Sequence, residues 1–381
     1  MLTSVPGVGH LHPILPLAKA LQARGDDVLW LTAASSCDRL RREGIDAAEA
    51  GIEEADGMAE FHRRFPEARD IPAHELPEFM FPRLFVAVRA RRMLDDALPI
   101  AQAWSPDILI CDAAELAGPL IAASLGVPNV THSFGALLPP SRVAGASDLM
   151  APIWVEQGLE PRPFCGCYDH LYLDIYPPSL QHADFGHVGM TQLVRPEGLA
   201  TGGEPLPDFV TADAAAPLLY LTLGTVFSSE TVLATVVKAL SDLAIRAVVT
   251  VGPRGDPAAL GSQPDNVFVA RYIPQQELLP HCTAVISHGG SGTFLAALAA
   301  GLPQLCLPQA ADQFLNASAA EASGCALAIR PADLSPDAVT QSVTRILDEP
   351  EFRERAQRLG EEIASMPDAT VVAERIATLV S

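Results

Sequence analysis

The stretch Ser287-His288-Gly289-Gly290-Ser291-Gly292-Thr293 follows an apolar run at 284–286 and precedes an alanine- and leucine-rich run that ends near Gly301. This pattern predicts a short buried strand, a glycine-rich turn and a helix. The first N–H groups of such a helix point to one place, and the glycines let an anion approach the backbone there. The histidine and the hydroxyls of the stretch add donors. The pattern therefore favours a phosphate site over a turn that only connects a strand to a helix.

The composition limits the classes of function that the chain can have. Its 381 residues are enough for two domains, and 49% of them are hydrophobic. The formal net charge of -21 argues against nucleic acid or an anionic membrane surface as a partner, because both would be repelled. No apolar run is long enough to span a membrane and no signal peptide is visible, so we expect a cytoplasmic protein.

The 7 cysteines are scattered along the chain, and several lie within apolar runs. This placement is typical of reduced thiols in the core of an intracellular protein. Cys165-Gly-Cys167 with His170 nearby resembles half of a metal site, but no second ligand pair at zinc-like spacing accompanies it. We therefore expect no bound metal ion.

Short apolar runs alternate with helical patterns in both halves of the chain. A turn at 5–10 precedes a helix that ends at Gly25, and only Met1 to Ser4 precede that turn, so the first strand is either very short or lacks its start. Further strands are expected at 28–31, 107–111 and 129–131, and in the second half at 218–223, 247–251, 267–270, 284–287 and 304–307. The predicted fold class is α/β, with two doubly wound, Rossmann-like parallel sheets that face each other across a cleft.

The domain boundaries are predicted from shifts in composition. We expect an N-terminal domain over 1–200 and a C-terminal domain over 217–365. The polar segment 201–216, rich in glycine and proline, is the expected interdomain linker. The last segment, 366–381, is expected to form a helix that returns to the N-terminal domain.

The segment 50–104 breaks the alternation and holds many of the phenylalanines. We expect one or two amphipathic helices and loops over the C-terminal edge of the first sheet, where open α/β folds bind ligands. The candidate residues for binding an apolar acceptor are Phe61, Phe79, Phe81, Phe85 and His132. Ordinary helix packing explains each of these phenylalanines equally well.

Four polar clusters of the second half each follow an expected strand: Gly224-Thr225, Tyr272-Ile273-Pro274-Gln275, the 287–293 stretch and Asp312-Gln313. They would line the C-terminal edge of the second sheet. Thr225 would donate to a phosphate oxygen, Tyr272 would stack on a nucleobase, and backbone groups of Ile273 would bind the edge of that base. Asp312 and Gln313 suit adjacent sugar hydroxyls. Together these clusters predict a nucleotide-sugar site.

These residues resemble the donor signature of bacterial family 1 glycosyltransferases of GT-B fold, which decorate polyketides and other natural products. The match comprises Tyr272-Ile273-Pro274-Gln275-Gln276-Glu277-Leu278-Leu279, His288-Gly289-Gly290-Ser291-Gly292-Thr293, Pro308 and Asp312-Gln313. Gly9-His10-Leu11-His12-Pro13 resembles the N-terminal Gly-His-x-x-Pro of the family, and the two-domain organisation is similar over essentially the whole chain. The resemblance implies a nucleotide-sugar cosubstrate and no cofactor.

The resemblance also implies catalytic roles. The motif histidine of the family is the general base, and this role falls on His10, which would deprotonate an acceptor hydroxyl as that oxygen attacks the anomeric carbon with inversion. Asp112 occupies the place of the aspartate that orients this histidine. Helix capping is an alternative role for both residues, and His12 is a competing base. By the same resemblance, His288, the turn N–H groups and Thr225 stabilise the leaving nucleoside diphosphate without a metal ion.

Two departures from the family pattern concern the donor. Family members that use UDP-sugars often have a glutamate, eight residues after the motif histidine, that holds both ribose hydroxyls, and Ala296 stands at that position here. Its loss is tolerable if the ribose lacks its 2′-hydroxyl, so we expect a dTDP-linked deoxysugar. Tyr272 stands where many relatives have tryptophan, so stacking on the base should be weaker.

Two other functions also fit these residues: a nucleotide-sugar epimerase or hydrolase of the same architecture, and a non-catalytic partner that activates another enzyme. The aromatic segment 50–104 favours a transferase, because a bulky apolar acceptor such as a polyketide aglycone needs such a surface. The presence of His10, Asp112, His288 and the Asp312-Gln313 pair argues against a non-catalytic partner. No pattern predicts an oligomeric state.

Overall fold

The computed structural model describes residues 1–73, 75–182, 186–198, 205–212, 215–224, 229–253 and 255–380. The chain divides into two compact units. The N-terminal unit comprises Met1–Tyr176, Gln181–Glu197 and Met366–Ser381, and the C-terminal unit comprises Pro177–Leu180 and Gly198–Ser365. Each unit has its own parallel sheet and its own hydrophobic core.

The N-terminal unit is built on a 7-stranded parallel sheet in the order β3-β2-β1-β4-β5-β6-β7. Its strands are β1 (Leu2–Thr3), β2 (Leu29–Thr32), β3 (Asp46–Glu49), β4 (Leu109–Asp112), β5 (Asn129–His132), β6 (Leu171–Asp174) and β7 (Thr191–Leu193). The central strands are buried along almost their whole length, as strands covered by helices on both faces are. The chain order reverses between β1 and β4, which is where doubly wound folds bind ligands.

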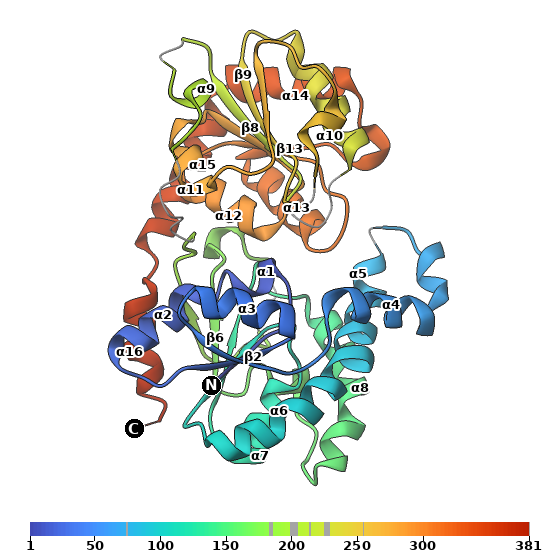
Figure 1. Ribbon diagram of the computed structural model, residues 1–381, viewed down its shortest axis with the longest axis vertical. Helices are drawn as coiled ribbons and strands as arrows, with labels where there is room; N and C mark the ends of the chain where they lie inside the picture. The colour runs from blue at the N-terminus through green and yellow to red at the C-terminus, as the bar shows by residue number, and fades with distance from the viewer. Residues whose placement is uncertain are drawn as a thin grey trace. The chain divides into compact units, whose positions relative to one another are not determined.

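Helices surround this sheet (Figure 1). They are α1 (Val8–Leu11), α2 (Leu15–Arg24), α3 (Ala34–Arg42), α4 (Glu54–Arg64), α5 (Leu76–Phe81), α6 (Arg91–Trp104), α7 (Gly118–Leu125), α8 (Pro140–Glu156) and α16 (Ala369–Ala377), with 3₁₀ turns η1 (Pro66–Asp70) and η3 (Pro163–Gly166) and the π-helical segment η2 (Pro82–Ala90). The C-terminal helix α16 packs against α2, and the N–H of Arg195 donates to the carbonyl of Pro367 just before it (Figure 1).

The segment 50–104 is more helical than the sequence pattern predicts. α5, η2 and α6 run on without a break, and α4 packs against η2. Phe61, Ala68, Leu84 and Val88 form a small hydrophobic core of their own there. Acidic residues and arginines interrupt the apolar pattern of this segment, which conceals the number of helices in the sequence.

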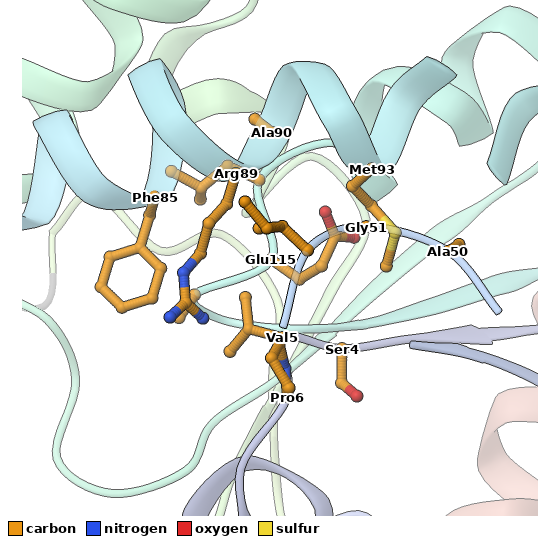
Figure 2. Close-up of a pocket in the computed structure, with 13 residues that line it drawn as sticks. Ser4, Val5, Pro6, Ala50, Gly51, Phe85, Arg89, Ala90, Met93 and Glu115 are labelled. Atoms are coloured by element: carbon orange, nitrogen blue, oxygen red, sulfur yellow. The ribbon is translucent and has the colours of Figure 1, made fainter. Parts of the chain in front are cut away.

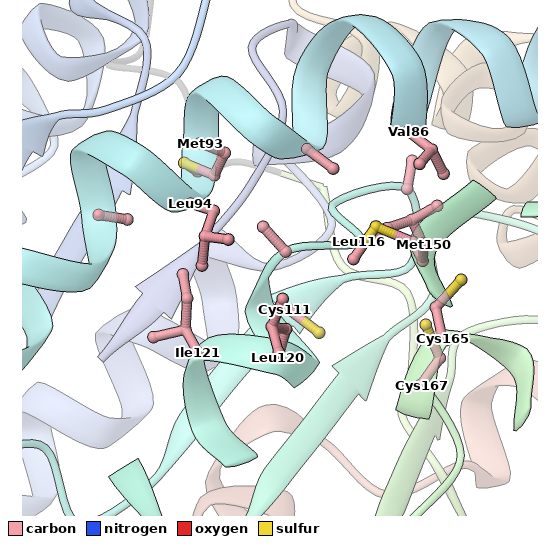
Figure 3. Packing of buried hydrophobic residues seen from close by; sticks show 14 of the residues in the cluster. Val86, Met93, Leu94, Cys111, Leu116, Leu120, Ile121, Met150, Cys165 and Cys167 are labelled. Carbon is pink, nitrogen blue, oxygen red and sulfur yellow. The ribbon is translucent and has the colours of Figure 1, made fainter. Parts of the chain in front are cut away.

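The main core of the N-terminal unit lies between β4 and the helices α6, α7 and α8 (Figure 3). Cys111, Cys165 and Cys167 belong to this core and are fully buried. Each of the cysteines of the described chain is free and buried. The pair Cys165 and Cys167 therefore fills core volume beside Met150 rather than facing a ligand (Figure 3).

The sequence pattern misses α8 and the strands β3, β6 and β7. Prolines conceal α8, although Pro139 and Pro140 lie at its beginning, where proline is tolerated, and only Pro152 lies inside it. The strands β3 and β7 are partly exposed, so they lack the continuous apolar run of the central strands.

The C-terminal unit is built on a 6-stranded parallel sheet in the order β10-β9-β8-β11-β12-β13. Its strands are β8 (Leu218–Thr222), β9 (Arg246–Thr250), β10 (Val267–Ala270), β11 (Ala284–Ser287), β12 (Gln304–Cys306) and β13 (Ala326–Ala328). Its helices are α9 (Asp208–Thr211), α10 (Glu230–Ser241), α11 (Gln275–Leu278), α12 (Ser291–Ala299), α13 (Gln313–Ser323), α14 (Pro336–Asp348) and α15 (Pro350–Ser365), with 3₁₀ turns η4 (Pro178–Leu180), η5 (Pro257–Leu260), η6 (Leu279–His281) and η7 (Pro331–Asp333). The predicted class, two doubly wound parallel sheets, is confirmed.

The predicted linker 201–216 lies partly outside the described residues, which omit 199–204 and 213–214. Its middle part is described and is folded. α9 lies there, and Leu206 and Phe209 pack against a core cluster of the C-terminal unit. In the described parts of the chain, no helix is both long and apolar enough to cross a membrane.

Candidate active site

The two predicted catalytic residues, His10 and Asp112, lie at the C-terminal edge of the N-terminal sheet. Because β1 and β4 are neighbours, the turn after β1 and the last residue of β4 meet at this edge. The turn begins α1 and carries His10, and Asp112 ends β4. Nδ1 of His10 lies 2.9 Å from Oδ2 of Asp112. The sequence thus folds so that the histidine and the aspartate form a pair.

The Asp112 side chain is fully buried, whereas that of His10 is 22% exposed. Backbone N–H groups of Val5 and Ala114 donate to the two carboxylate oxygens of Asp112 at 3.4 and 3.1 Å, which fixes its orientation. The contact with His10 is a close ion pair whose N–H direction is poorly aligned for a hydrogen bond. With Nδ1 turned to the carboxylate, Nε2 of His10 is the ring nitrogen left for a substrate.

Opposing influences act on the charge of His10. Burial disfavours the charged imidazole, but the negative charge of Asp112 and the contact with it outweigh burial and raise the pKa of His10 above its ordinary value. The Arg89 guanidinium acts in the opposite direction to Asp112, and Glu54 acts in the same direction. A base with a raised pKa holds an accepted proton more firmly, which suits proton abstraction from a hydroxyl.

The competing base, His12, has a different environment. Its Nε2 lies 3.2 Å from Nη1 of Arg39. Burial and the positive charge of Arg39 lower the pKa of His12 to about 4. A ring with that pKa is a weak base, so the geometry favours His10 over His12.

Two phenylalanines lie near His10. The ring centroid of Phe134 is 4.7 Å from that of His10, and the centroid of Phe85 is 6.4 Å away. Both phenylalanine side chains are half-buried, so each keeps some surface for a ligand. Phe85 is among the acceptor residues proposed from the sequence, whereas Phe134 is not. Its place just after β5, at the same sheet edge, is the signal that could have indicated it.

The other acceptor candidates lie within packed clusters. Phe61 is fully buried and Phe81 is nearly so. Phe79 contacts Phe61 edge-on, and Arg83 lies over its ring at 3.8 Å. His132 is fully buried, and burial lowers its pKa to about 4. Phe79 is half-buried and keeps some surface, whereas Phe61, Phe81 and His132 are buried.

A narrow pocket opens beside this pair, between the loops after β1 and β3 and the segment η2 (Figure 2). Phe85, Arg89 and Met93 form one wall, and Val5 and Glu115 face them. The walls come from the C-terminal edge of the sheet, which is the edge expected for ligand binding.

Glu115 is a buried carboxyl group that the sequence analysis did not single out. Its oxygens accept hydrogen bonds from the Thr3 hydroxyl at 2.6 Å and from the N–H groups of Ala117 and Gly118, both at 2.9 Å. Burial raises the pKa of Glu115 to about 7. Its contacts join β1 to the beginning of α7 beneath the pocket. A glycine is required at 118, since a Cβ there would lie 2.6 Å from Cβ of Cys111.

In the C-terminal unit, the 287–293 stretch forms the end of β11, a turn and the beginning of α12, as predicted. The His288 ring is wedged against two glycines. A Cβ at Gly290 would lie 2.4 Å from Nε2 of His288, and a Cβ at Gly224 would lie 2.6 Å from its Cε1. Burial lowers the pKa of His288, although Asp312 acts against this shift. The ring is therefore kept neutral beside the turn.

The beginning of α12 presents backbone donors. No side chain caps this helix, so the N–H groups of its first turn, which include Gly292 and Thr293, are available to an anion. Gly289 has a positive φ of 80°, a backbone conformation that glycine adopts without strain. Thr225, predicted to add a hydroxyl, lies outside the described residues.

Asp312 and Gln313 are partly engaged within the protein. The Ser291 hydroxyl donates to Oδ2 of Asp312 at 2.5 Å, and Asn316 donates to Ser291 at 3.0 Å. Oε1 of Gln313 accepts from the N–H groups of Gln309 and Ala310. Within the described ranges, Oδ1 of Asp312 and Nε2 of Gln313 have no hydrogen-bond partner, so a ligand can still use them.

This arrangement differs from the expectation for Ser291, whose hydroxyl hydrogen is directed to Asp312 and not to the anion site. The residue before Asp312 is strained, because Ala311 adopts a positive φ of 55°.

The predicted base-binding residues follow β10. Tyr272 is 58% exposed and Ile273 is buried. Nε2 of Gln275, at the first position of α11, is buried and has no hydrogen-bond partner among the residues that the structure covers. An exposed aromatic ring beside a buried open donor is an arrangement that suits a planar polar ring.

Comparison with known families identifies the chain. The family model "Erythromycin biosynthesis protein CIII-like, N-terminal domain" matches residues 19–224, and the corresponding C-terminal domain model matches residues 234–379. The chain belongs to this family. Elloramycin glycosyltransferase ElmGT of Streptomyces olivaceus is 32% identical over 404 residues, which cover 99% of this chain and 96% of that protein. L-demethylnoviosyl transferase of Streptomyces niveus is 33% identical, with 99% of this chain and 97% of that protein covered.

Solved structures agree with this assignment. Spinosyn rhamnosyltransferase SpnG, complexed with thymidine diphosphate, superposes with a TM-score of 0.82 at 28% identity and 99% coverage of both chains. The same values hold for SpnG complexed with spinosyn aglycone. The chain is thus a glycosyltransferase. Its resemblance to natural-product glycosyltransferases is confirmed.

Within this glycosyltransferase, the predicted site residues form two groups. His10, Asp112 and Phe85 lie together at the sheet edge of the N-terminal unit. Gly224, His288 and Gly290 lie together in the C-terminal unit, and Asp312 contacts Ser291 there. The sequence analysis missed Phe134, Arg89, Glu115 and Asn316. The last two are buried polar residues near motif residues, a combination that a sequence does not show.

Proposed function

We propose that the glycosyltransferase moves a deoxysugar from dTDP to a hydroxyl of a natural-product aglycone, with inversion and without a metal ion. The observation that carries this proposal is the buried pair of His10 and Asp112, 2.9 Å apart beside Phe85 and Phe134. Support for the donor comes from SpnG, which was solved with thymidine diphosphate. Support for the acceptor comes from elloramycin glycosyltransferase and from SpnG with its spinosyn aglycone.

In the proposed reaction, Nε2 of His10 accepts the proton of the acceptor hydroxyl. The freed oxygen forms a bond to the anomeric carbon of the sugar while the bond from that carbon to the diphosphate oxygen breaks, which inverts the anomeric configuration. Asp112, whose Oδ2 lies 2.9 Å from Nδ1 of His10, stabilises the imidazolium that forms by its negative charge. Since the carboxylate of Asp112 is itself held by two backbone N–H groups, the ring keeps this orientation through the turnover.

The leaving diphosphate gains a negative charge as the bond breaks. The first N–H groups of α12 and the neutral ring of His288 offer hydrogen-bond donors for this charge in a partly buried place. Oδ1 of Asp312 and Nε2 of Gln313 are proposed to bind sugar hydroxyls. The sugar donor is thus proposed to be bound by local hydrogen-bond donors, because the net charge of the chain, -21, does not attract a diphosphate.

The nucleotide is proposed to be dTDP because Ala296 replaces the ribose-binding glutamate of the family pattern. Ala296 lies on α12 and packs against a hydrophobic cluster, where it offers no hydrogen bond to a 2′-hydroxyl. Titration calorimetry with dTDP and UDP tests this point, and tighter binding of UDP would contradict it.

The reaction is tested by incubating the protein with a dTDP-deoxysugar and an aromatic aglycone, with and without EDTA. We expect a glycoside whose anomeric configuration is opposite to that of the donor, formed at the same rate in both samples. His10→Ala should abolish the product and leave dTDP affinity within a few-fold of wild type. Retention of configuration, inhibition by EDTA or full activity of the variant would each overturn the proposed mechanism. Sugar release or epimerisation without an acceptor would favour the alternative enzymes.

A further inference from the structure

The pocket beside His10 is apolar except at one end. Most of its lining residues are apolar, among them Val5, Phe85 and Met93 (Figure 2). The space between them fits about one water-sized group, such as an oxygen substituent, and does not fit a ring. The guanidinium of Arg89 lies beside Phe85 and Val5 in this pocket (Figure 2).

Arg89 is a buried cation that is only partly satisfied. Its residue is 4% exposed, and its one hydrogen bond to the described residues runs from Nη2 to Oε2 of Glu54 at 2.8 Å. Its Nε is buried without a partner. An unpaired donor on a buried charged group costs free energy, so such a group is expected to bind an acceptor oxygen.

A second buried arginine of the same unit, Arg142, has a partner for its Nε, unlike Arg89. Arg142 is 8% exposed and, like Arg89, faces a half-exposed glutamate. Both Nε and Nη2 of Arg142 donate to Oε1 of Glu78, at 3.1 and 2.9 Å. Arg142 therefore has its Nε satisfied within the protein, whereas Arg89 does not.

The distances relate Arg89 to the proposed base. The Arg89 guanidinium carbon lies 5.5 Å from the ring centroid of Phe85, and that centroid lies 6.4 Å from the His10 ring. Phe85 thus lies near both the Arg89 guanidinium and the His10 ring. An aromatic ring that packs on Phe85 could present one oxygen to His10 and another to Arg89.

The nearby carboxyl groups do not block an anion at this end. Glu115 lines the pocket, but its oxygens face Thr3, Ala117 and Gly118, which donate to them. Glu54 binds Arg89 from the solvent side, because its side chain is 51% exposed. Nε of Arg89 lies against Gly57 of α4, so Nη1, which makes no hydrogen bond to the described residues and is not fully buried, remains the donor that a ligand in the pocket would meet.

We propose that Arg89 binds an acidic oxygen of the acceptor, so that the acceptor class is an aromatic aglycone with a carboxylate or ionised phenol close to the hydroxyl that is glycosylated. This inference rests on the proposed function, since it concerns the acceptor of that reaction. Arginine suits this role because it always carries a positive charge, and hydrogen bonds between charged groups are the strong ones.

The test uses 3,5-dihydroxy-2-naphthoic acid and its methyl ester at pH 7.5, with the full chain and titration calorimetry. We expect the wild type to bind the acid about tenfold or more tightly than the ester. Arg89→Gln should remove this preference and leave the affinity for the ester within a few-fold. Arg142→Gln, the matched control, should keep the preference.

A second variant guards against misfolding of Arg89→Gln. Glu54→Gln removes the competing carboxylate at a half-exposed position, and it should increase the affinity for the acid a few-fold without changing that for the ester. Equal binding of acid and ester to the wild type, binding of neither, a retained preference in Arg89→Gln or no gain in Glu54→Gln would overturn the inference.

Measuring dTDP affinity on the same samples separates the two proposals. If all variants bind dTDP but none discriminates acid from ester, only the role of Arg89 is wrong. If the wild type fails to bind dTDP, the proposed function itself is wrong.

Discussion

His10 and His12 are two residues apart in the chain, and their neighbours give them opposite properties. Asp112 raises the pKa of His10, while burial and Arg39 lower that of His12 to about 4. The sequence motif favours His10, but only the structure shows the Arg39 contact that weakens His12 as a base. Sequence reasoning could propose His10 and Asp112 because they occupy the places of the catalytic pair in the family that the sequence resembles. It could not find Arg89, because a sequence does not show that Nε of this arginine is buried without a hydrogen-bond partner among the described residues.

Asp112→Asn is expected to lower kcat by about 10²–10⁴-fold, because the neutral amide no longer stabilises the imidazolium. The substitution also removes the charge that raises the pKa of His10, so the acidic limb of the pH–rate profile should move to lower pH. The measurement is kcat/KM between pH 5 and 9. His12→Gln is the control and should keep both rate and profile close to wild type. An unchanged profile for Asp112→Asn would mean that Asp112 does not act on the base.

At the scale of elements, the strand, turn and helix at 284–299 follow the sequence pattern closely. β11 covers Ala284–Ser287, the predicted strand, and α12 begins at Ser291. A buried strand and a glycine-rich turn are strong local signals. α8 has no such signal, because it is held by tertiary packing of Trp154 and Met150 in the main core. The side-chain network of Ser291, Asp312 and Asn316 likewise depends on the approach of α12 and α13, which no local pattern specifies.

Gly290→Ala should weaken dTDP binding by about tenfold or more, since its Cβ would overlap Nε2 of His288 at 2.4 Å and displace the ring. Titration calorimetry measures the affinity, and circular dichroism checks that the variant folds. Gly145→Ala is the matched control, because a Cβ at that helical position meets no atom within 4 Å. If Gly290→Ala binds dTDP as tightly as wild type, the position of the His288 ring is irrelevant to the donor.

At the scale of the whole molecule, each unit has a sheet of standard doubly wound form, and the alternation of apolar runs is enough to predict that class. The sequence pattern does not show which segments complete each unit. Residues 177–180 group with the C-terminal unit, and residues 366–381 group with the N-terminal unit. Such assignments depend on long-range packing, which is absent from local periodicity.

Glu115 and Asp174 are expected to lower the stability of the N-terminal unit as the pH rises from about 4 to 7, whereas His12 and His132, whose pKa values are lowered to about 4, act in the opposite direction. Burial raises the pKa of Glu115 to about 7 and that of Asp174 to about 6. Between the ordinary and the raised values, the folded protein holds protons that the unfolded chain has released, so a higher pH favours unfolding. For Glu115 alone the effect is on the order of 3 kcal/mol.

Differential scanning calorimetry at a series of pH values measures the contribution of Glu115. Glu115→Gln cannot ionise, so its melting temperature should fall less, or rise more, with pH than that of the wild type. Glu160→Gln, at an exposed position, is the control and should retain the wild-type slope. A wild-type slope in Glu115→Gln would show that Glu115 keeps one protonation state throughout this range.

The packing of α16 against α2 has a consequence for synthesis and for recombination of the chain. Early strands of the N-terminal unit emerge from the ribosome long before the helix that covers α2, so the unit waits for the rest of the chain to be translated before its last apolar face is covered. A chimera that joins this N-terminal half to the donor half of a relative should therefore keep residues 366–381 from the same parent as α2. A single crossover near residue 200 would separate α16 from the helix α2 against which it packs.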